Sequence, residues 1–443
     1  MLANVLSAPV LADLGDDLVV RRATPDDIEA VIDFNTRCFD ERVTQWTRDL
    51  ISGEHPTVQP DDFTLVENTR TQQIVSSMCA ISQMWSYGGI SVPVARPELV
   101  ATDPAYRRRG LIRHQFEAMH ARSAAKGELL QVITGVDWFY RQFGYEMGVK
   151  LWGSRGVAAA HLGPVQEPET CRLRPVADPD RAFVRDLYAH AARRHLYAAV
   201  RSPDEWDYEF SGRSERNTRR REWVIVESAD GEELGYVQYL PCLASSQWRM
   251  FRIYQVELKP GASYLNLSSS LLRALWRHGE ALRSSGALAC DELQGLELAL
   301  ESEHPLFHAA PPEWLHEIKT SPWYLRVPDR AAFLRRVRDA LERHLIGTVA
   351  EGFTGELKLN FCRRGLRLEL VRGVITAIED WKPRELSEGN ARFPEPLFDH
   401  LLYGWRRVGE LIENFPDCRA DHAAEVLLDC LFPPFHGKVW VLA

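Results

Sequence analysis

The chain has 443 residues, 53 Lys and Arg against 62 Asp and Glu, a formal net charge of −9 at pH 7, and a hydrophobic share of 45%. This length predicts two or three domains. The acidic balance argues against a nucleic-acid-binding protein, which normally presents a basic face. No apolar stretch approaches the roughly 20 residues of a membrane span, and the first 18 residues lack the pattern of a secretion signal. Eight scattered cysteines without a C-x-x-C pair favour reduced thiols and a cytoplasmic location.

The N-terminal part begins with a strand, an arginine, a Pro-Asp turn and an amphipathic helix over residues 19–34. A short strand at residues 97–101 then leads into a turn that holds Arg107, Arg108, Arg109 and Gly110. The apolar residues Ile112, Phe116 and Met119 predict a helix behind this turn, and Gly127 is a plausible end for it.

The arginine-rich turn has the chemistry of an anion site. The N–H groups of a first helical turn have no partners within the helix, and the helix dipole favours negative charge there. A glycine at residue 110 would let the backbone approach a bulky anion, and arginines bind phosphate oxygens through charge-assisted bonds. The pattern suits a pyrophosphate. A cluster of solvated surface arginines is the alternative at this point.

A strand at residues 129–133 and the stretch FYRQFGYE follow this helix. Together, VATDPAYRRRGLI and FYRQFGYE resemble the acetyl-CoA signature of the Gcn5-related N-acetyltransferases (GNAT). The resemblance implies that loop amides grip the pyrophosphate and that a splayed strand pairs with the pantetheine arm. Ile112 stands where the family usually has a smaller residue. The implied coenzyme contacts are Glu98, Leu99, Val100, Arg107, Arg108, Arg109, Gly110, Leu111, Ile112 and Arg113.

The chain then repeats its opening pattern. After a polar linker at residues 164–170, residues 171–187 again carry a strand, an arginine, a Pro-Asp turn and a helix. A later strand, RIYQVELKP, and a helix, SSSLLRALWRHG, enclose a loop, GASYLN, that has no arginine. Such a loop lacks the main grip on pyrophosphate, so the second copy is predicted to be catalytically silent and to act as a scaffold.

The last third alternates apolar and polar residues with glycine turns over residues 356–381, which predicts antiparallel strands. Leu401, Val408, Leu411 and Phe415 then fall at helical spacing. This α+β module resembles a sterol-carrier-protein fold, in which a lipid tunnel and a plain structural role are both conceivable. A tandem acetyltransferase pair with such a tail resembles the enhanced-intracellular-survival (Eis) acetyltransferases, some of which acetylate aminoglycosides at several amines.

The expected fold class is therefore α/β and α+β, with two GNAT folds in tandem followed by a sterol-carrier-protein-like domain. The expected limits are 1–163 for the catalytic domain, 171–310 for the degenerate copy and 320–443 for the third domain. The resemblance further implies a homo-oligomer, a hexamer.

Acetyl transfer to an amine requires a proton donor for the departing thiolate and a route for the amine proton. The resemblance assigns the donor to Tyr140 and leaves Tyr145 as a packing residue. In Eis-like enzymes the C-terminal carboxylate enters the active site, which corresponds to Ala443, although this chain ends in VWVLA and the best-known members end in an acidic and an aromatic residue. Glu41 and Asp137 are the alternative bases.

The acceptor pocket of the family corresponds to the first helix–loop region, with Phe39, Asp40, Glu41 and Trp46. Aromatic faces beside carboxylates would suit a cationic amine, although each residue is equally explicable by packing or surface charge.

No metal site is predicted. His190 and His195 do not share a helical face, and no ligand set completes a site around them. His114 and His120 are expected to face solvent.

The sequence thus predicts acetyl transfer from acetyl-CoA to a primary amine of a small cationic acceptor (aminoglycoside-like, polyamine or lysine). The alternative is a non-catalytic acyl-CoA-sensing or lipid-binding protein.

Overall fold

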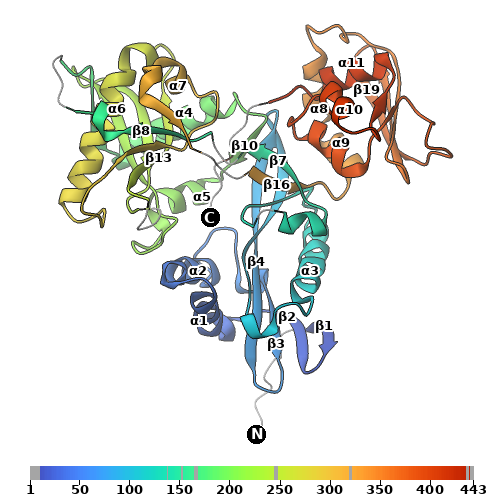
Figure 1. The fold of residues 1–443 in the computed structure, drawn as a ribbon, viewed down its shortest axis with the longest axis horizontal. Helices are drawn as coiled ribbons and strands as arrows, with labels where there is room; N and C mark the ends of the chain where they lie inside the picture. The colour runs from blue at the N-terminus through green and yellow to red at the C-terminus, as the bar shows by residue number, and fades with distance from the viewer. Residues whose placement is uncertain are drawn as a thin grey trace.

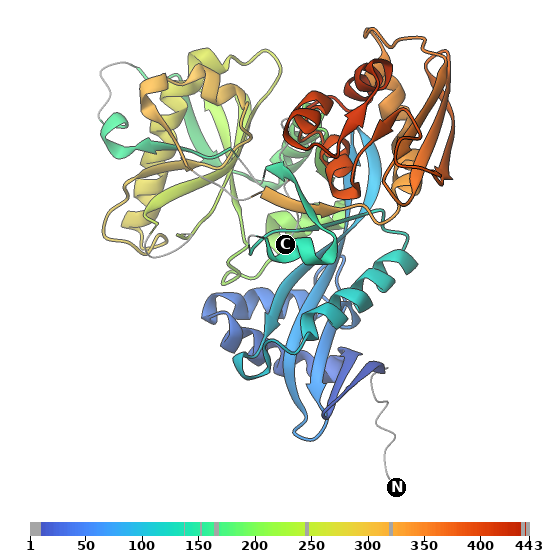
Figure 2. The ribbon, with the colours of Figure 1, turned by 45° about the vertical axis from the view of Figure 1, so that its right-hand side comes forward.

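The computed structural model describes residues 10–136, 138–150, 153–163, 168–243, 248–318, 322–435 and 439. Three bodies, each built around one sheet, make up this part of the chain (Figures 1 and 2). The N-terminal body lies at the bottom of both views, with the second and third bodies above it. No described helix is both long and apolar enough to cross a membrane. The architecture is mixed α/β and α+β, as predicted.

The first sheet carries the N-terminal body. Its strands run in the order β1 (Val10–Gly15), β2 (Leu18–Arg22), β3 (Phe63–Asn68), β4 (Gln73–Tyr87), β5 (Ile90–Thr102), β6 (Leu130–Ile133), β16 (Pro322–Arg326) and β7 (Glu146–Lys150), and β10 (Tyr197–Val200) also pairs with β4. Helices α1 (Ile28–Cys38) and α2 (Thr44–Ile51) cover one face, and α3 (Leu111–Ala125) covers the other (Figure 1). The helix predicted after the arginine turn is confirmed as α3, and Gly127 follows it with φ of +70°.

Two strands, β10 and β16, reach the first sheet from distant parts of the sequence. β16 lies between β6 and β7, where Trp323 is opposite Val149 and Tyr324 is opposite Ile133. Both aromatic side chains are buried, and the Trp323 ring meets the Trp85 ring edge-on at 5.7 Å. The first sheet is therefore completed by residues beyond 320, in a segment that the sequence analysis placed in another domain.

The second sheet has the order β15 (Leu315–Glu317), β8 (Arg155–Ala158), β14 (Gly295–Leu298), β13 (Met250–Leu258), β12 (Glu233–Tyr239), β11 (Glu222–Ser228) and β9 (Cys171–Pro175). Its helices include α4 (Arg181–Ala192), α5 (Pro203–Asp207), α6 (Tyr264–Ser284) and α7 (Pro305–Ala309). The order β9-β11-β12-β13-β14 matches β2-β3-β4-β5-β6 of the first sheet, and in both sheets the last of these pairs is parallel.

The repeat extends to individual side chains. Arg21 on β2 bonds Asp27 in the turn before α1, with 2.7 Å between Nη2 and Oδ1. Arg174 on β9 bonds Asp180 before α4 in the same way, at 2.9 Å. Each arginine also binds a glutamate on the neighbouring strand, Glu67 on β3 or Glu227 on β11. The same strand–turn–helix connection is thus stabilised twice by the same ion pairs.

The third body is the α+β module. Its strands have the order β19 (Val374–Trp381), β18 (Gly365–Val371), β17 (Gly355–Asn360), β20 (Ala391–Arg392) and β21 (Arg419–Ala420), and its helices are α8 (Arg330–Leu345), α9 (Glu395–Leu402), α10 (Val408–Asn414) and α11 (His422–Leu431). The antiparallel strands predicted over residues 356–381 are present. The helical spacing from Leu401 to Phe415 spans two helices instead of one, because the chain turns at Gly404 with φ of +64°.

The predicted domain limits do not follow the boundaries of the sheets, because strands pair with the sheet on the other side of a predicted limit. β8 precedes residue 163 and pairs within the second sheet, whereas β10 follows residue 171 and pairs within the first. The hydrophobic core of the third body is continuous with the first sheet around Trp85 and Trp323. The bodies therefore share backbone hydrogen bonds and apolar cores.

Candidate active site

The cleft of the N-terminal body begins where β5 and β6 separate. The two parallel strands pair Val94 with Leu130 and Ala95 with Gln131, and the pairing ends there. Farther along β5, an extra residue is inserted opposite β4 between Glu98 and Ala101, and Leu99 has φ of +52°. Such a bulge bends a strand and increases its twist. The separation exposes a strand edge to which an extended ligand chain can add by backbone hydrogen bonds.

The arginine loop closes one end of this cleft. Arg108 and Gly110 both adopt left-handed backbone conformations, with φ of +65° and +76°. A Cβ atom on Gly110 would meet nothing within 4 Å, so the glycine serves the backbone conformation and leaves open space beside the start of α3. The unpartnered N–H groups and the dipole of this helix start favour an anion. The local chemistry is that of a phosphate site.

A cavity of about 520 Å³ occupies the cleft. Its walls come from the end of α1, the end of β5, the arginine loop, the start of α3 and the turn after β6. The lining residues are Cys38, Phe39, Val100, Ala101, Thr102, Tyr106, Arg107, Arg108, Gly110, Leu111, Ile112, Arg113, Val136, Phe139, Tyr140, Gln142 and Phe143. A cationic loop at one end and an aromatic wall at the other suit a ligand with a charged head and an apolar arm.

Tyr140 lies in the aromatic wall, within the short 3-10 helix Phe139–Phe143. Its side chain is largely buried, and the residue lines the cavity. Burial, with smaller contributions from Glu98 and Tyr324, raises the pKa of Tyr140 well above its usual value. The hydroxyl therefore stays protonated at neutral pH and can donate a hydrogen bond or a proton into the cleft.

Tyr324 on β16 supports this wall. Its ring packs against Tyr140 with centroids 5.9 Å apart, and its hydroxyl accepts a hydrogen bond of 2.9 Å from the backbone N–H of Trp138. The sequence analysis did not single out Tyr324. Apolar periodicity in SPWYLRV indicates a buried strand but does not say which sheet receives it.

Tyr145 and His120 form a separate pair below the cleft. The Tyr145 side chain is buried, and its hydroxyl lies 3.2 Å from Nε2 of His120. Burial lowers the pKa of His120 to about 3, with a further contribution from Arg326. The prediction that His120 faces solvent is wrong, because the residue follows Phe116 by one helical turn and shares its inner face. The side chain of His114, beside Glu117, is 42% exposed.

The structure brings most of the predicted site residues together. Phe39, Val100, Arg107, Arg108, Gly110, Leu111, Ile112, Arg113 and Tyr140 all line the cleft cavity. Six other predicted residues do not line this cavity, and two of them, Asp40 and Trp46, are described below. Leu99 is buried toward α1, Glu98 binds Arg96, the guanidinium of Arg109 lies 5.0 Å over the Tyr106 ring, and Glu41 is exposed. Asp137 and Ala443 lie outside the described residues.

Asp40 and Trp46 line a second cavity of about 340 Å³, which shares Phe39 with the first. The Trp46 ring is covered by the guanidinium of Arg219 at 4.1 Å, and Asp40 is paired with Arg42 at 2.7 Å. The aromatic face and the carboxylate predicted to attract a cationic amine are thus both in contact with arginines of the protein.

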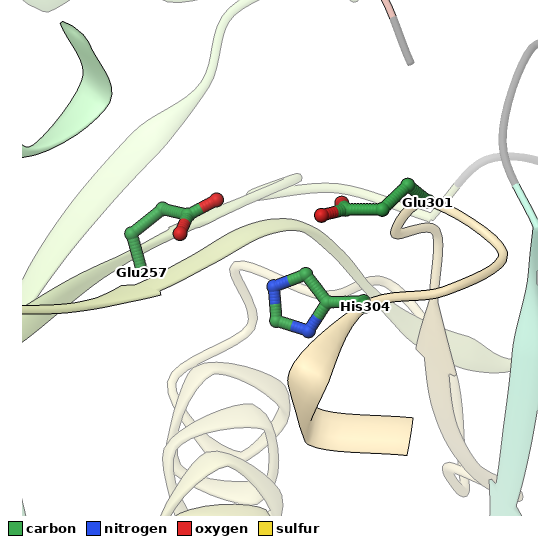
Figure 3. A group of neighbouring side chains, drawn as sticks. All are labelled: Glu257, Glu301 and His304. Carbon is green, nitrogen blue, oxygen red and sulfur yellow. The ribbon is translucent and has the colours of Figure 1, made fainter. Parts of the chain in front are cut away.

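The corresponding cleft of the second body is filled by side chains. Figure 3 shows Glu257, Glu301 and His304 converging at this place, with ligand-type atoms within 4.8 Å of one another. Nη2 of Arg194 lies 2.9 Å from Glu257 and 3.1 Å from Glu301, so a guanidinium neutralises both carboxylates.

His304 in this trio has both ring nitrogens engaged. Its Nε2–H donates to the Val256 carbonyl at 2.8 Å, and its Nδ1 accepts from the Leu306 N–H at 3.0 Å. A neutral imidazole has one ring nitrogen with a lone pair that can bind a metal. In His304 this lone pair accepts the hydrogen bond from the Leu306 N–H. The trio fits a buried ion-pair network with Arg194 better than a metal site, and the remaining space is only about 20 Å³.

Comparison with known proteins gives a consistent result. Residues 19–148 match the acetyltransferase (GNAT) domain family. No curated protein sequence matches the chain. Similar solved structures include a GCN5-related N-acetyltransferase from Anabaena variabilis (16% identity, TM-score 0.66, covering 95% of this chain and 99% of that one). A probable N-acyltransferase from Enterococcus faecalis (15%, 0.65, 96% and 99%) and Eis1 from Mycobacterium abscessus (15%, 0.60, 96% and 99%) are also similar.

At these identities the solved structures establish the fold, which extends over almost the whole chain. The match at residues 19–148 covers the strands and helices that build the cleft. Residues 19–148 of the N-terminal body are thus similar to the acetyltransferase (GNAT) domain family.

Proposed function

We propose that this protein is an Eis-like enzyme that transfers the acetyl group of acetyl-CoA to a primary amine of a small acceptor. The observation that carries the proposal is the cleft in which a splayed strand edge, an arginine loop and the Tyr140 hydroxyl meet. These features match the three parts of the donor: the pantetheine arm, the pyrophosphate and the thioester.

The cleft residues fit acetyl-CoA, which supplies the activated acyl group. Arg107, Arg108 and Arg113 line the cationic end and would bind the pyrophosphate together with the N–H groups around Gly110. Val100 follows the bulge and lines the cleft at the strand edge that would pair with the pantetheine amides.

Tyr140 would complete the reaction. The amine nitrogen attacks the thioester carbonyl, a C–N bond forms, the C–S bond breaks, and the amine loses one proton. Tyr140 donates a proton to the departing thiolate, a role that suits a hydroxyl whose pKa is raised by burial and which therefore stays protonated at neutral pH. The base that takes the amine proton is proposed to be the carboxylate of Ala443, with Asp137 and the exposed Glu41 as alternatives.

The second and third bodies have other proposed roles. The arginine-free loop before α6 and the side chains that fill the second cleft support a catalytically silent GNAT-like domain. The third body is proposed to be a sterol-carrier-protein-like domain with a structural role. By the resemblance to Eis enzymes, we propose a homohexamer. The scattered cysteines, all free thiols, support a cytoplasmic location.

Acetyl transfer can be tested with the purified full-length protein. Acetyl-CoA is incubated with a panel of primary amines (an aminoglycoside, a polyamine, lysine and smaller amines), and released CoA is followed with a thiol reagent. We expect at least one amine to give enzyme-dependent CoA release and a product heavier by one acetyl group. Tight acetyl-CoA binding in calorimetry without transfer to any amine would instead favour the acyl-CoA-sensing or lipid-binding alternative.

A further inference from the structure

The second cavity lies between two bodies of the molecule. One wall is the turn from α1 to α2, with Asp40 and Trp46, and the other is formed by residues 218–221 and by β13 of the second body. In Figures 1 and 2, a loop of the second body approaches α2 from above. Phe39, which is 44% exposed, lines both this cavity and the coenzyme cleft. A molecule in the second cavity would therefore lie beside the donor cleft.

The charge of this cavity is strongly positive. Four arginines line it, and Asp40 is its one carboxylate among the described residues. Two arginines are neutralised by carboxylates at 2.7 Å, Arg42 by Asp40 and Arg252 by Glu297. Neither Arg219 nor Arg221 forms an ion pair with a described residue. The cavity thus keeps two guanidinium groups without a direct carboxylate partner among the described residues, and Glu209 acts on Arg221 only from a longer distance.

These two guanidinium groups are held in place by aromatic rings. Arg219 lies 4.1 Å over the Trp46 ring, and Arg221 lies 4.3 Å over the Tyr254 ring. Nη1 of Arg221 also donates to the Arg220 carbonyl at 2.8 Å. Stacking fixes the plane of a guanidinium and leaves its N–H edge available for a bidentate oxyanion.

The electrostatics of the surrounding groups agree with an anion site. Burial, together with the positive charges of Arg213 and Arg219, lowers the pKa of Arg221. Burial opposes ionisation of Tyr254, yet Arg221 and Arg252 outweigh it and lower the pKa of this phenol. Burial is the largest cause of the Arg221 shift, whereas the Tyr254 shift reports a local positive potential, which a negatively charged ligand would relieve.

We infer that the second cavity binds an oxyanion of the acceptor, so that the acceptor carries a carboxylate or a phosphate in addition to its primary amine. The inference rests on the proposed acetyl transfer. A planar, fixed pair of arginines matches the two oxygens of a carboxylate or phosphate. A polyamine or an aminoglycoside, which carries only positive charge, would be repelled at this place. The volume of about 340 Å³ suits a small metabolite.

Matched acceptors test the chemistry directly. L-lysine is compared with cadaverine, L-tyrosine with tyramine, and phosphoethanolamine with ethanolamine, so that each pair shares an amine and differs in the acid group. We expect the acidic member of at least one pair to have a kcat/KM about tenfold or more higher than its partner. The first two pairs report a carboxylate and the third reports a phosphate. Equal or better use of the member that lacks the acid group in all three pairs would overturn the inference.

Two variants and a control assign the effect to the cavity. Arg219→Gln and Arg221→Gln each remove one positive charge that has no direct ion pair with a described residue. We expect about a 10- to 100-fold loss of kcat/KM for the acidic acceptor, with little change for the partner that lacks the acid group. Arg220→Gln makes the same charge change in the same loop. Its side chain pairs with Glu222 at 2.8 Å and does not line the cavity, so it should behave as wild type. Unchanged acetyl-CoA affinity shows that each variant is folded.

Calorimetry separates this inference from the proposed function. The amines with and without the acid group are titrated into the full-length protein saturated with CoA. Binding of an acidic probe that weakens in Arg219→Gln and Arg221→Gln, without acetyl transfer, would support the anion site and contradict the transferase. If acceptors with and without the acid group are acetylated equally well, and neither variant changes this, the result would support the transferase and contradict the anion site.

Discussion

Replacing Tyr140 by phenylalanine isolates the proposed proton donor. The substitution keeps the ring that packs against Phe116 and Tyr324, with centroids 6.1 and 5.9 Å away, and removes only the hydroxyl. The residue lines the cleft, and no hydrogen bond to another described residue is assigned to its hydroxyl. The folded structure therefore loses almost nothing, whereas the reaction loses its acid.

The expected magnitude follows from these two observations. General acid catalysis by a positioned side chain contributes about 10²- to 10⁴-fold, which corresponds to about 2.7–5.4 kcal/mol of activation free energy. We expect kcat of Tyr140→Phe to fall within this range, while the acetyl-CoA dissociation constant and the thermal midpoint stay close to wild type. Because burial raises the pKa of Tyr140, any fall of kcat in wild type between pH 8 and 10 should persist in the variant.

Tyr145→Phe is the matched control. It removes a hydroxyl from the same motif, but this one bonds His120 and does not line the cleft. Losing that bond should cost about 0.5–1.5 kcal/mol of stability and leave kcat nearly unchanged. Turnover is measured by CoA release and stability by thermal denaturation. An unimpaired kcat in Tyr140→Phe would refute the assignment and leave water or another group as the donor.

Three further changes test the remaining assignments. The double variant Arg107→Ala, Arg108→Ala should weaken acetyl-CoA binding at least about tenfold at low salt, as measured by calorimetry. The loss should be smaller at high salt, because both side chains are exposed and salt screens exposed charges. Unchanged affinity would mean that the pyrophosphate lies elsewhere. Extending the chain beyond Ala443 by three glycines should abolish turnover without affecting acetyl-CoA binding, and normal turnover would assign the base to another group. Burial lowers the pKa of His120 to about 3 in the folded protein. A histidine in the unfolded chain has a pKa near 6.5 and therefore binds a proton more strongly. The folded state thus loses stability as the pH falls from about 6.5 toward 3. His120→Asn should therefore lose less thermal stability than wild type between pH 6.5 and 4.5, with His114→Asn as the partly exposed control on the same helix; equal losses in His120→Asn and wild type would contradict the assignment.

The sequence by itself determined the arginine loop, because all of the structural requirements of this loop are local. A strand, a turn with a left-handed glycine and a helix start follow one another within a short stretch. The residues of this stretch, Arg107, Arg108, Gly110 and Arg113, therefore come together independently of the rest of the chain. The internal repeat was also visible, since a strand, an arginine and a Pro-Asp turn are local features. The two ion pairs that confirm it join residues six positions apart.

Only the tertiary structure decided what surrounds that loop. Tyr324 supports Tyr140 from a strand inserted more than 180 residues later in the sequence, and Arg219 covers Trp46 from the second body. Apolar periodicity reports that a strand is buried but is the same for every sheet that could receive it. The second cavity is assembled by such long-range packing, so the sequence predicted a site for a cationic amine at Asp40 and Trp46, whereas the folded chain places arginines there.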